Sequence, residues 1–482
     1  MLIIPIITAG LLILSFPPFD FSYLIWFSLV SIFLYIGFKS IKPLKSFLIG
    51  FAGYAIGISF IFSGSIRNYG VFFYIYTILY HSILSGGIVA TVFSLTKSKK
   101  TLIRFLVVCV SFVLIEYIKT LGIFSFPCSI DLTQTSNIFL LQITKFTGHY
   151  GIGLVIILIN MILSEIFYLI VVKKTKINGI LILISVLILI VITNFIPVYS
   201  DTKKSNPLTI SILQTGLPIS FYNSINKIEV FSIYEKQIKA VQADLLVIPE
   251  GLGKIIIENK QVDLLKNIAS NKNMNILINI DDVNINYTQK YNSSALIESN
   301  GLLWQYYHKT KIIPIAEKEY HPGKKIQRLL SFMGYKIGIN ICFESLYPEI
   351  ARRQVKRGAD FIVIQANDAG FTGKIIPELH LRYSIFRACE NGVWVIHASQ
   401  AGPSAFISPD GKVISKTTLF EKTNLTETIN IMKAQTFYNK YGDWLIYLSL
   451  VIVSIYGFNF FAKGRCQNPT FTFFCRETKE NK

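Results

Sequence analysis

Long apolar segments dominate the first 200 residues of the chain. A helix that spans a bilayer needs about 20 mostly apolar residues, with a range of about 17–25. Seven segments before residue 200 and one after residue 440 approach this length, at about 2–16, 22–38, 46–62, 72–95, 103–122, 150–172, 178–198 and 443–462. The first could also be a cleaved signal peptide. Because it lacks a basic start and is followed by Pro17-Pro18-Phe19-Asp20 instead of small residues, we expect a retained helix.

The pattern changes between residues 205 and 435, where short β-branched runs alternate with amphipathic stretches. We expect strands at Thr209–Leu213, Ala243–Ile248, Ile276–Ile280, Lys336–Ile341, Asp360–Ile364 and Gly392–His397, and helices at 222–242, 258–270, 345–357 and 377–391. Asn300-Gly301 and Asp410-Gly411 each separate two further runs, and both dipeptides favour the positive φ of tight hairpins. Strands mixed with helices in this way indicate a layered α/β sandwich.

Composition supports a membrane protein. Hydrophobic residues make up 52% of the 482 residues and charged residues only 16%, whereas soluble proteins carry about 25% charged residues. The net charge of +19 could indicate nucleic-acid binding. Many of the lysines lie in links between apolar segments, however, where a basic excess orients a membrane protein. We therefore expect a membrane-embedded protein with no nucleic-acid partner.

The basic residues of the links predict an orientation. One set of alternate links holds ten of them and the other set three, namely Lys39, Lys42, Lys45, Lys97, Lys99, Lys100, Arg104, Lys173, Lys174 and Lys176 against Arg67, Lys119 and Lys145. Links rich in lysine and arginine stay in the cytoplasm. With seven spans before it, the segment 205–435 is expected on the outer side, and the tail 463–482 is expected in the cytoplasm.

Three residues of the α/β segment stand where a scaffold displays reactive groups. Glu250 follows the apolar run 245–249, Lys309 follows a predicted strand at Trp304–His308, and Cys342 ends the run 338–342. A thiol nucleophile needs a base, and an ammonium can stabilise a developing oxyanion. Each residue also has a simpler interpretation: a buried apolar thiol, a solvated turn carboxylate and a surface lysine. The six cysteines form no CxxC pair, and no metal or nucleotide motif occurs, so we predict no cofactor.

The wider set of motifs resembles the nitrilase, or carbon–nitrogen hydrolase, superfamily. The matching segments are Pro249-Glu250, Tyr307 to Lys311 with Pro314 to Glu317, Ile341 to Glu344, Asn367-Asp368-Ala369, His380 to Glu390 and the hairpin Gly402 to Gly411. Seven spans before such a domain and one after it, with Phe16 to Phe19 reading Phe-Pro-Pro-Phe, resemble the apolipoprotein N-acyltransferase family. The resemblance implies a polytopic α-helical membrane domain of about eight spans with an α-β-β-α sandwich domain. The domains would be 1–200, 205–435 and the helix 443–462, followed by the tail.

The resemblance also implies roles for individual residues. Glu250 would be the general base, Lys309 the oxyanion-stabilising cation and Cys342 the nucleophile. Glu317, Glu344 and Phe343 would support the site. The alternative for both glutamates is a salt bridge to a nearby lysine, and for Glu317 the sequence favours neither interpretation.

The chain departs from the family pattern at three places. Phe343 stands where tyrosine is usual, Gly370 replaces a tryptophan, and Ile315-Ala316 replaces Phe-Gly. These changes leave the three catalytic residues in place and affect the expected fit of the lipid chains.

The family's reaction gives the expected function. A fatty acyl chain would pass from a phospholipid to Cys342, and then to the N-terminal amine of a diacylglyceryl-cysteine on an apolipoprotein. The expected location is the cytoplasmic (inner) membrane, with the catalytic domain on the periplasmic side. Two alternatives are a membrane-anchored amidase that passes the acyl group to water, and a non-catalytic receptor or transporter. Nothing in the sequence indicates an oligomeric state.

Overall fold

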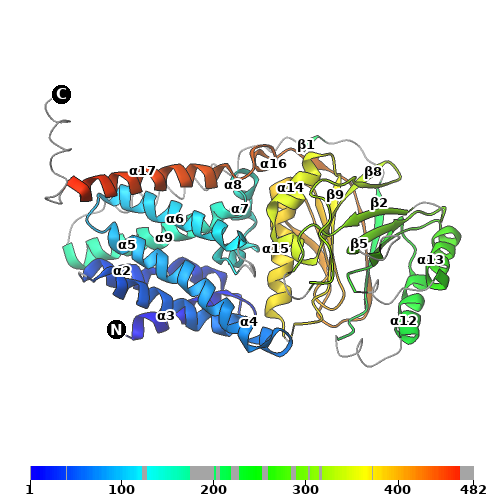
Figure 1. The fold of residues 1–482 in the computed structure, drawn as a ribbon, viewed down its shortest axis with the longest axis horizontal. Coiled ribbons are helices and arrows are strands. Elements are labelled where there is room, and N and C mark those ends of the chain that lie inside the picture. Colours follow the sequence, from blue (N-terminus) through cyan, green and yellow to red (C-terminus); the bar gives the residue numbers. More distant parts are fainter. Residues whose placement is uncertain are drawn as a thin grey trace.

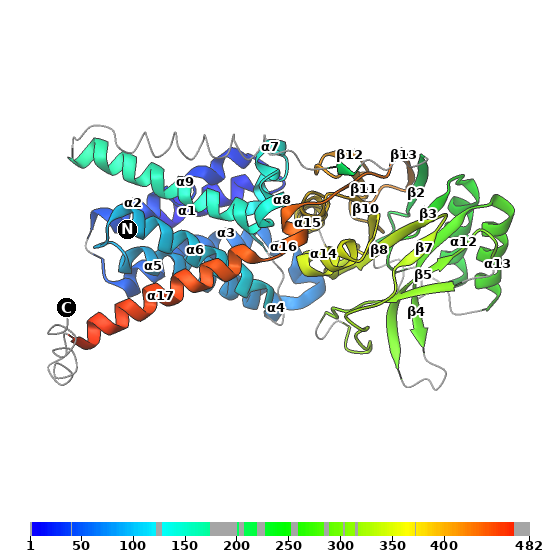
Figure 2. The same cartoon turned by 90° about the horizontal axis from the view of Figure 1, so that it is seen from above.

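The chain folds into a helical bundle joined end to end with an α/β domain (Figure 1). The computed structural model describes residues 2–39, 41–121, 128–173, 200–201, 207–218, 227–251, 259–283, 289–301, 304–313, 317–371 and 373–466. The bundle contains the first described stretch of the chain and the last helix, α17 (Trp444–Cys466), which runs along it (Figure 2). The α/β domain lies between them in sequence.

The helices of the bundle differ widely in length. They are α1 (Ile3–Ser15), α2 (Val30–Phe38), α3 (Pro43–Ile61), α4 (Ile66–His81), α5 (Val89–Leu95), α6 (Thr101–Leu121) and α9 (Tyr150–Tyr168), with a π-helical turn Ser82–Ile88 between α4 and α5. Among the described residues, four helical segments are long and apolar enough to cross a membrane: Pro43–Ile61, Gly70–Leu95, Thr101–Leu121 and Tyr150–Val171. These four confirm four of the spans predicted from the sequence.

The remaining predicted spans are not all of full length in the described residues. Three correspond to shorter apolar helices, Ile3–Ser15, Ser22–Phe38 and Trp444–Asn459. The segment 178–198 lies outside the described residues. The count of eight spans therefore stays a prediction.

Glycine allows the closest approach between two bundle helices. A Cβ added at Gly50 of α3 would lie 2.2 Å from the carbonyl oxygen of Gly86 in the π-helical turn, and one added at Gly86 would lie 2.4 Å from the carbonyl oxygen of Gly50. Small residues at such contacts let helix backbones pack tightly where lipid offers no hydrophobic driving force.

The α/β domain contains two six-stranded sheets. One has the order β12-β11-β10-β9-β8-β7 and the other β13-β2-β3-β4-β5-β6. Their bounds are β2 (Leu208–Gln214), β3 (Leu245–Val247), β4 (Asn275–Val283), β5 (Lys290–Ile297), β6 (Trp304–His308), β7 (Leu330–Phe332), β8 (Tyr335–Ile341), β9 (Phe361–Ala366), β10 (Trp394–Ser399), β11 (Ala405–Ile407), β12 (Val413–Lys416) and β13 (Thr423–Ile429). Apolar side chains from the inner faces of both sheets form one core, as alternation along the strands requires.

Two pairs of helices cover the outer faces of this sandwich. Helices α12 (Lys227–Ala240) and α13 (Asn259–Lys272) lie at the end far from the bundle, and α14 (Pro348–Lys356) and α15 (Ile375–Asn391) cover the other sheet (Figure 1). The α-β-β-α sandwich predicted from the sequence is therefore confirmed. The hairpins are present as well: β5 pairs with β6 and β11 with β12, with positive φ at Gly301 and Gly411.

Helix α15 joins the two parts, because it packs on the sheet with one side and faces the bundle with the other (Figure 1). Arg382 donates to the carbonyl oxygen of Leu132 at 3.1 Å and pairs with Asp20 at 2.5 Å. The backbone N–H of His149 donates to Glu390 at 2.9 Å. The segment 128–149, read from sequence as a simple link, is thus the bundle's contact with α15. It contains the short helices α7 (Ile138–Leu141) and α8 (Thr144–Thr147).

Candidate active site

The structure brings together the three residues that the sequence singled out. Glu250 lies just past β3, Lys309 directly follows β6, and Cys342 directly follows β8. The Lys309 ammonium is fully buried and lies 3.6 Å from the Glu250 carboxylate. The thiol of Cys342 is close enough for the charges of both Glu250 and Lys309 to act on its pKa. Two strands of one sheet and one strand of the facing sheet therefore supply the site.

A buried asparagine connects the two carboxylates around Lys309. Asn292, on β5, donates to Glu250 at 2.8 Å and to Glu317 at 2.9 Å, and Lys309 donates to Glu317 at 2.8 Å. The side-chain oxygen of Asn292 accepts from Asn279 at 2.7 Å, which fixes the orientation of its amide. Glu317 thus forms a salt bridge and is part of the site at the same time, so both interpretations of this residue hold geometrically.

The charges around Lys309 keep it protonated. Burial alone lowers the pKa of Lys309, but the carboxylates of Glu250 and Glu317 outweigh burial and hold the pKa above its usual value. Burial likewise raises the pKa of Glu317, and Lys309 outweighs it, so that the pKa of Glu317 falls below its usual value. The site therefore contains a permanent cation close to the Cys342 thiol.

The thiol of Cys342 stands on a strained turn. Cys342 is the first residue of a 3₁₀ helix, Cys342–Leu346, and its φ is 49°, a conformation that is uncommon for residues other than glycine. Burial raises the pKa of the thiol well above its usual value, and Glu250 adds to this, while Lys309 acts in the opposite direction. The resting group is accordingly a thiol, which needs a base to become a nucleophile.

Glu344 ties the turn of Cys342 to the loop of Lys309. Its buried carboxylate accepts from the Tyr307 hydroxyl at 3.0 Å, from both the backbone N–H and the hydroxyl of Thr310 at 2.6 Å, and from the backbone N–H of Lys311 at 3.2 Å. It also accepts from the backbone N–H of Ile341 at 2.8 Å. These partners are hydroxyl and backbone groups, so Glu344 forms a cross-strand clamp, and none of these hydrogen bonds is the alternative salt bridge to a lysine side chain.

An apolar pocket opens beside the thiol. It encloses about 480 Å³ of empty space, counting the part open to solvent, and its lining includes Cys342. The apolar part of the lining comes from Ile313, Phe343, Leu346, Phe371, Leu379 and Tyr383. Two of these belong to α15, the helix that contacts the bundle. The pocket can therefore receive an apolar chain next to the nucleophile.

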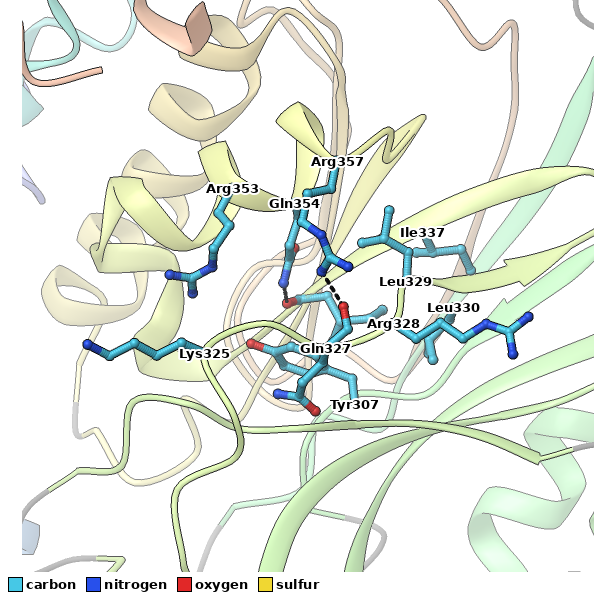
Figure 3. Close-up of a pocket in the computed structure, with 11 residues that line it drawn as sticks. Tyr307, Lys325, Gln327, Arg328, Leu329, Leu330, Ile337, Arg353, Gln354 and Arg357 are labelled. Atoms are coloured by element: carbon cyan, nitrogen blue, oxygen red, sulfur yellow. Dashed lines mark hydrogen bonds between the residues drawn. The ribbon is translucent and has the colours of Figure 1, made fainter. Parts of the chain in front are cut away.

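A second pocket, lined in part by Tyr307, has a different character (Figure 3). Four basic side chains contribute to its lining: Lys325, Arg328, Arg353 and Arg357. Arg357 donates to the backbone carbonyl of Gln327, and Gln354 donates to that of Ile339 at 2.6 Å. Cys342 does not contribute to this lining, so the basic pocket is separate from the candidate active site.

One group of described residues has the composition of a metal site. Asp368, His380 and His397 are all buried, and one potential ligand atom of each lies within 4.8 Å of the others. His380 Nδ1 is already hydrogen-bonded to Asp368 at 2.8 Å. Because a metal ion would have to replace this bond, the arrangement fits an internal ion pair better than a metal centre.

Comparison with known proteins identifies the family of the chain. Residues 8–162 match the family described as apolipoprotein N-acyltransferase N-terminal domain, and residues 231–438 match the family described as carbon-nitrogen hydrolase. The apolipoprotein N-acyltransferase of Geobacter metallireducens is 26% identical over 94% of this chain and 94% of its own length. That of Thermotoga maritima is 22% identical over 94% of this chain and 92% of its own. The chain belongs to the apolipoprotein N-acyltransferase family.

Two solved structures that resemble about half of this family member are a protein of the nitrilase superfamily and an amidase. Nit3 of Saccharomyces cerevisiae matches with a TM-score of 0.40 and 18% identity, covering 48% of this chain and 93% of that one. An amidase from Nesterenkonia sp. matches with a TM-score of 0.40 and 18% identity, covering 52% of this chain and 99% of that one.

Some residues of the site were not singled out from the sequence of this family member. Asn292 gave no signal in the sequence, because it lies among polar residues that precede the apolar run Ala295–Ile297. Asp368 and His380 occurred in matching segments, but no role was predicted for them. Of the departures from the family pattern, Phe343 lines the apolar pocket and packs against Tyr347 with 5.5 Å between ring centroids. Residues 315–316 lie outside the described part of the chain.

Proposed function

We propose that the protein is an apolipoprotein N-acyltransferase that moves a fatty acyl chain from a phospholipid to the N-terminal amine of a diacylglyceryl-cysteine on a lipoprotein. The observation that carries this proposal is the apolar pocket beside Cys342, next to a buried lysine and a buried glutamate. The pocket suits an acyl chain, and the three polar groups suit acyl transfer. The relatives that the chain matches over most of its length are named for the same activity.

In the first half-reaction Cys342 would attack the ester carbonyl of the phospholipid. Glu250 would take the thiol proton, which the raised pKa of Cys342 makes necessary. The Lys309 ammonium would stabilise the negative charge on the tetrahedral intermediate. When the ester C–O bond breaks, Glu250 returns its proton to the leaving alkoxide, and the products are a lysophospholipid and a Cys342 thioester.

In the second half-reaction the same groups would act, with Cys342 now as the leaving group. The amine of the diacylglyceryl-cysteine attacks the thioester carbonyl, Glu250 takes a proton from the amine, and the C–S bond breaks. Cys342 leaves as a thiolate and recovers its proton from Glu250. The acyl group ends in an amide, and the kinetics are of the ping-pong type.

The bundle has a physical role in this scheme. Removing acyl chains from a bilayer costs about 0.8 kcal/mol per CH₂ group, so a site that adjoins the membrane avoids most of that cost. We place the chain in the cytoplasmic membrane with residues 205–435 on the periplasmic side, as the distribution of basic residues in the links favours. Green fluorescent protein fused to the C-terminus should then fluoresce, and a dark but full-length fusion would contradict this orientation.

Intact-protein mass spectrometry tests the reaction. Purified wild type incubated with phospholipid should gain the mass of one acyl chain, and a diacylglyceryl-cysteine peptide should remove it. Cys342→Ala should gain nothing, whereas Cys389→Ala, which changes a buried cysteine of α15, should behave as wild type. An adduct that water alone removes would indicate the amidase alternative. Absence of any adduct on wild type would refute the proposal.

A further inference from the structure

A buried histidine–aspartate pair lies directly beneath the Cys342 turn. His380, on α15, places Nε2 3.1 Å from the backbone carbonyl oxygen of Cys342 and 2.9 Å from the hydroxyl of Ser345. Its other ring nitrogen, Nδ1, lies 2.8 Å from the carboxylate of Asp368. The acyl-transfer scheme with Glu250, Lys309 and Cys342 gives neither residue a part.

The partners of the ring decide its protonation state. A carboxylate and a backbone carbonyl can only accept hydrogen bonds, and His380 has one such acceptor at each nitrogen. Each of these two acceptors favours a proton on the nitrogen that it faces, and the Ser345 hydroxyl near Nε2 can accept as well as donate, so the three partners together favour an imidazolium. Asp368 is held as a carboxylate by the Ser399 hydroxyl, which donates to it at 3.0 Å. Burial alone lowers the pKa of His380, but Asp368 outweighs it and raises the pKa above the usual value.

The hydrogen bond from His380 to the Cys342 carbonyl oxygen stabilises the backbone conformation of the turn. A non-glycine residue at positive φ is held against its conformational preference, and Cys342 has a φ of 49°. Rotation of the peptide unit that follows Cys342 would relieve this strain and swing the side chain. A charged donor on the carbonyl oxygen opposes that rotation, because charge-assisted hydrogen bonds are roughly twice as strong as neutral ones.

We propose that His380 is a positioning residue whose imidazolium, paired with Asp368, binds the Cys342 carbonyl and fixes the turn that aims the thiol. The inference rests on the proposed function in one respect only, that Cys342 is the nucleophile. Charged or titratable groups from three elements surround the His380 ring: Asp368 after β9, Glu250 after β3, and His397 on β10. The rings of His397 and His380 lie 5.2 Å apart. Burial, reinforced by the charge of His380, lowers the pKa of His397 to about 3, so His397 stays neutral.

The alkylation rate of Cys342 tests this inference without any lipid substrate. Iodoacetamide is added to the full-length protein in detergent, and labelling of the Cys342 peptide is followed by mass spectrometry between pH 6 and pH 8. Asp368→Asn removes the charge that raises the pKa of His380, so its ring becomes neutral at a lower pH than in wild type. The variant should react about 10–100-fold more slowly than wild type at pH 8, and the deficit should shrink at pH 6, where the ring is protonated again.

Two further variants separate positioning from general damage. His380→Gln has no titrating group, so its deficit should be the same at all pH values. His321→Gln, which alters an exposed histidine of the same domain, should match wild type. Melting temperatures are measured for all three. The proposal is overturned if the alkylation rates of Asp368→Asn and His380→Gln are reduced by the same factor at every pH. It is also overturned if folded Asp368→Asn reacts as fast as wild type. If the pH signature appears but wild type forms no acyl adduct, the positioning role stands and the proposed function fails.

Discussion

Replacing Glu344 by glutamine tests whether one carboxylate fixes the position of Cys342 relative to Lys309. Glu344 is completely buried and accepts hydrogen bonds from groups on two separate segments, the loop after β6 and the end of β8. Glutamine has nearly the same shape but only one acceptor oxygen. If that oxygen keeps the bonds to Thr310 and Tyr307, the new NH₂ group faces the backbone N–H of Ile341, where the carboxylate accepted at 2.8 Å.

The expected loss of stability follows from these contacts. A buried donor left without a partner costs about 1–3 kcal/mol. The remaining bonds change from charge-assisted to neutral, which loses roughly a further 1 kcal/mol for each well-formed bond. The loss is partly offset, because burial raises the pKa of Glu344 and the neutral amide avoids the cost of burying a charge. We expect Glu344→Gln to lower the free energy of unfolding by about 2–4 kcal/mol.

The functional effect should exceed the effect on stability alone. Lys309 directly precedes Thr310, and Cys342 directly follows Ile341, so loosening the clamp changes the distance between the lysine and the thiol. A displacement of about 1 Å in an active site can reduce the rate about 100-fold. We expect the rate of acyl-adduct formation to fall by about 10–100-fold, with little change in the phospholipid concentration at half-maximal rate.

Thermal melts and the acyl-adduct assay measure both effects. Glu421→Gln is the matched control, since Glu421 also accepts from a backbone N–H and a hydroxyl, both of Thr418, but is exposed. Its stability should change by about 0.5 kcal/mol or less. An unchanged melting temperature in Glu344→Gln would refute the energetic reasoning. A lower melting temperature with an unchanged rate would refute the view that the clamp sets the catalytic geometry.

Three further predictions concern the neighbours of Lys309 and the pocket. Asn292→Ala removes the donor shared by Glu250 and Glu317 and should slow adduct formation about 10–100-fold; a wild-type rate would contradict the role of this asparagine. Glu317→Gln should lower the melting temperature at pH 7, because Lys309 outweighs burial and holds the pKa of Glu317 below its usual 4.5. That stabilisation is present above pH 4.5 and is lost as the pH falls through the folded pKa, so the melting curves should converge in acid, and a constant difference would exclude this cause. Leu379→Trp narrows the apolar pocket and should shift the preference from long-chain to short-chain phospholipids in competition assays; an unchanged preference would mean that the acyl chain lies elsewhere.

The strands of the catalytic domain were predictable because their signals are local. Runs such as Lys336–Ile341 and Asp360–Ile364 are β-branched and buried, and the structure places β8 and β9 there. Asn300-Gly301 and Asp410-Gly411 marked hairpins through their backbone preferences alone. Strands β7 and β13 were missed, since β7 has only three residues and β13, with seven, has an exposed, polar face. Such segments become strands through pairing with neighbours that are distant in sequence.

The segment 128–149 shows the limit of hydropathy. Its apolar residues are too few for a span, so the sequence indicated a link. In the structure they form short helices whose apolar side chains, such as Leu132 and Leu141, are buried in a core that continues into the catalytic domain. Hydropathy measures the preference for an apolar environment, and it does not distinguish lipid from a protein partner.

The candidate site was predictable only in part, because only some of its residues have a local signal in the sequence. Glu250, Lys309 and Cys342 stand at strand ends, where a sequence reader can see that a polar group follows a buried run. Asn292 lies within a strand, and whether it faces the site depends on the register of β5 against β4, which no local pattern fixes. The partnership of Asp368 and His380 depends on a loop and a helix meeting across the sheet, and only the folded chain brings them together.

The position of α15 explains why the catalytic chemistry and the membrane part form a single unit. Most of its residues are buried, because the sheet covers one side and the bundle the other. The same helix places His380 under the Cys342 turn, lends Leu379 and Tyr383 to the apolar pocket, and contacts the bundle through Arg382. Its position therefore fixes the nucleophile, the pocket and the bundle relative to one another. If the protein transfers acyl chains as proposed, a chain that arrives from the bundle side would reach the thiol along this helix.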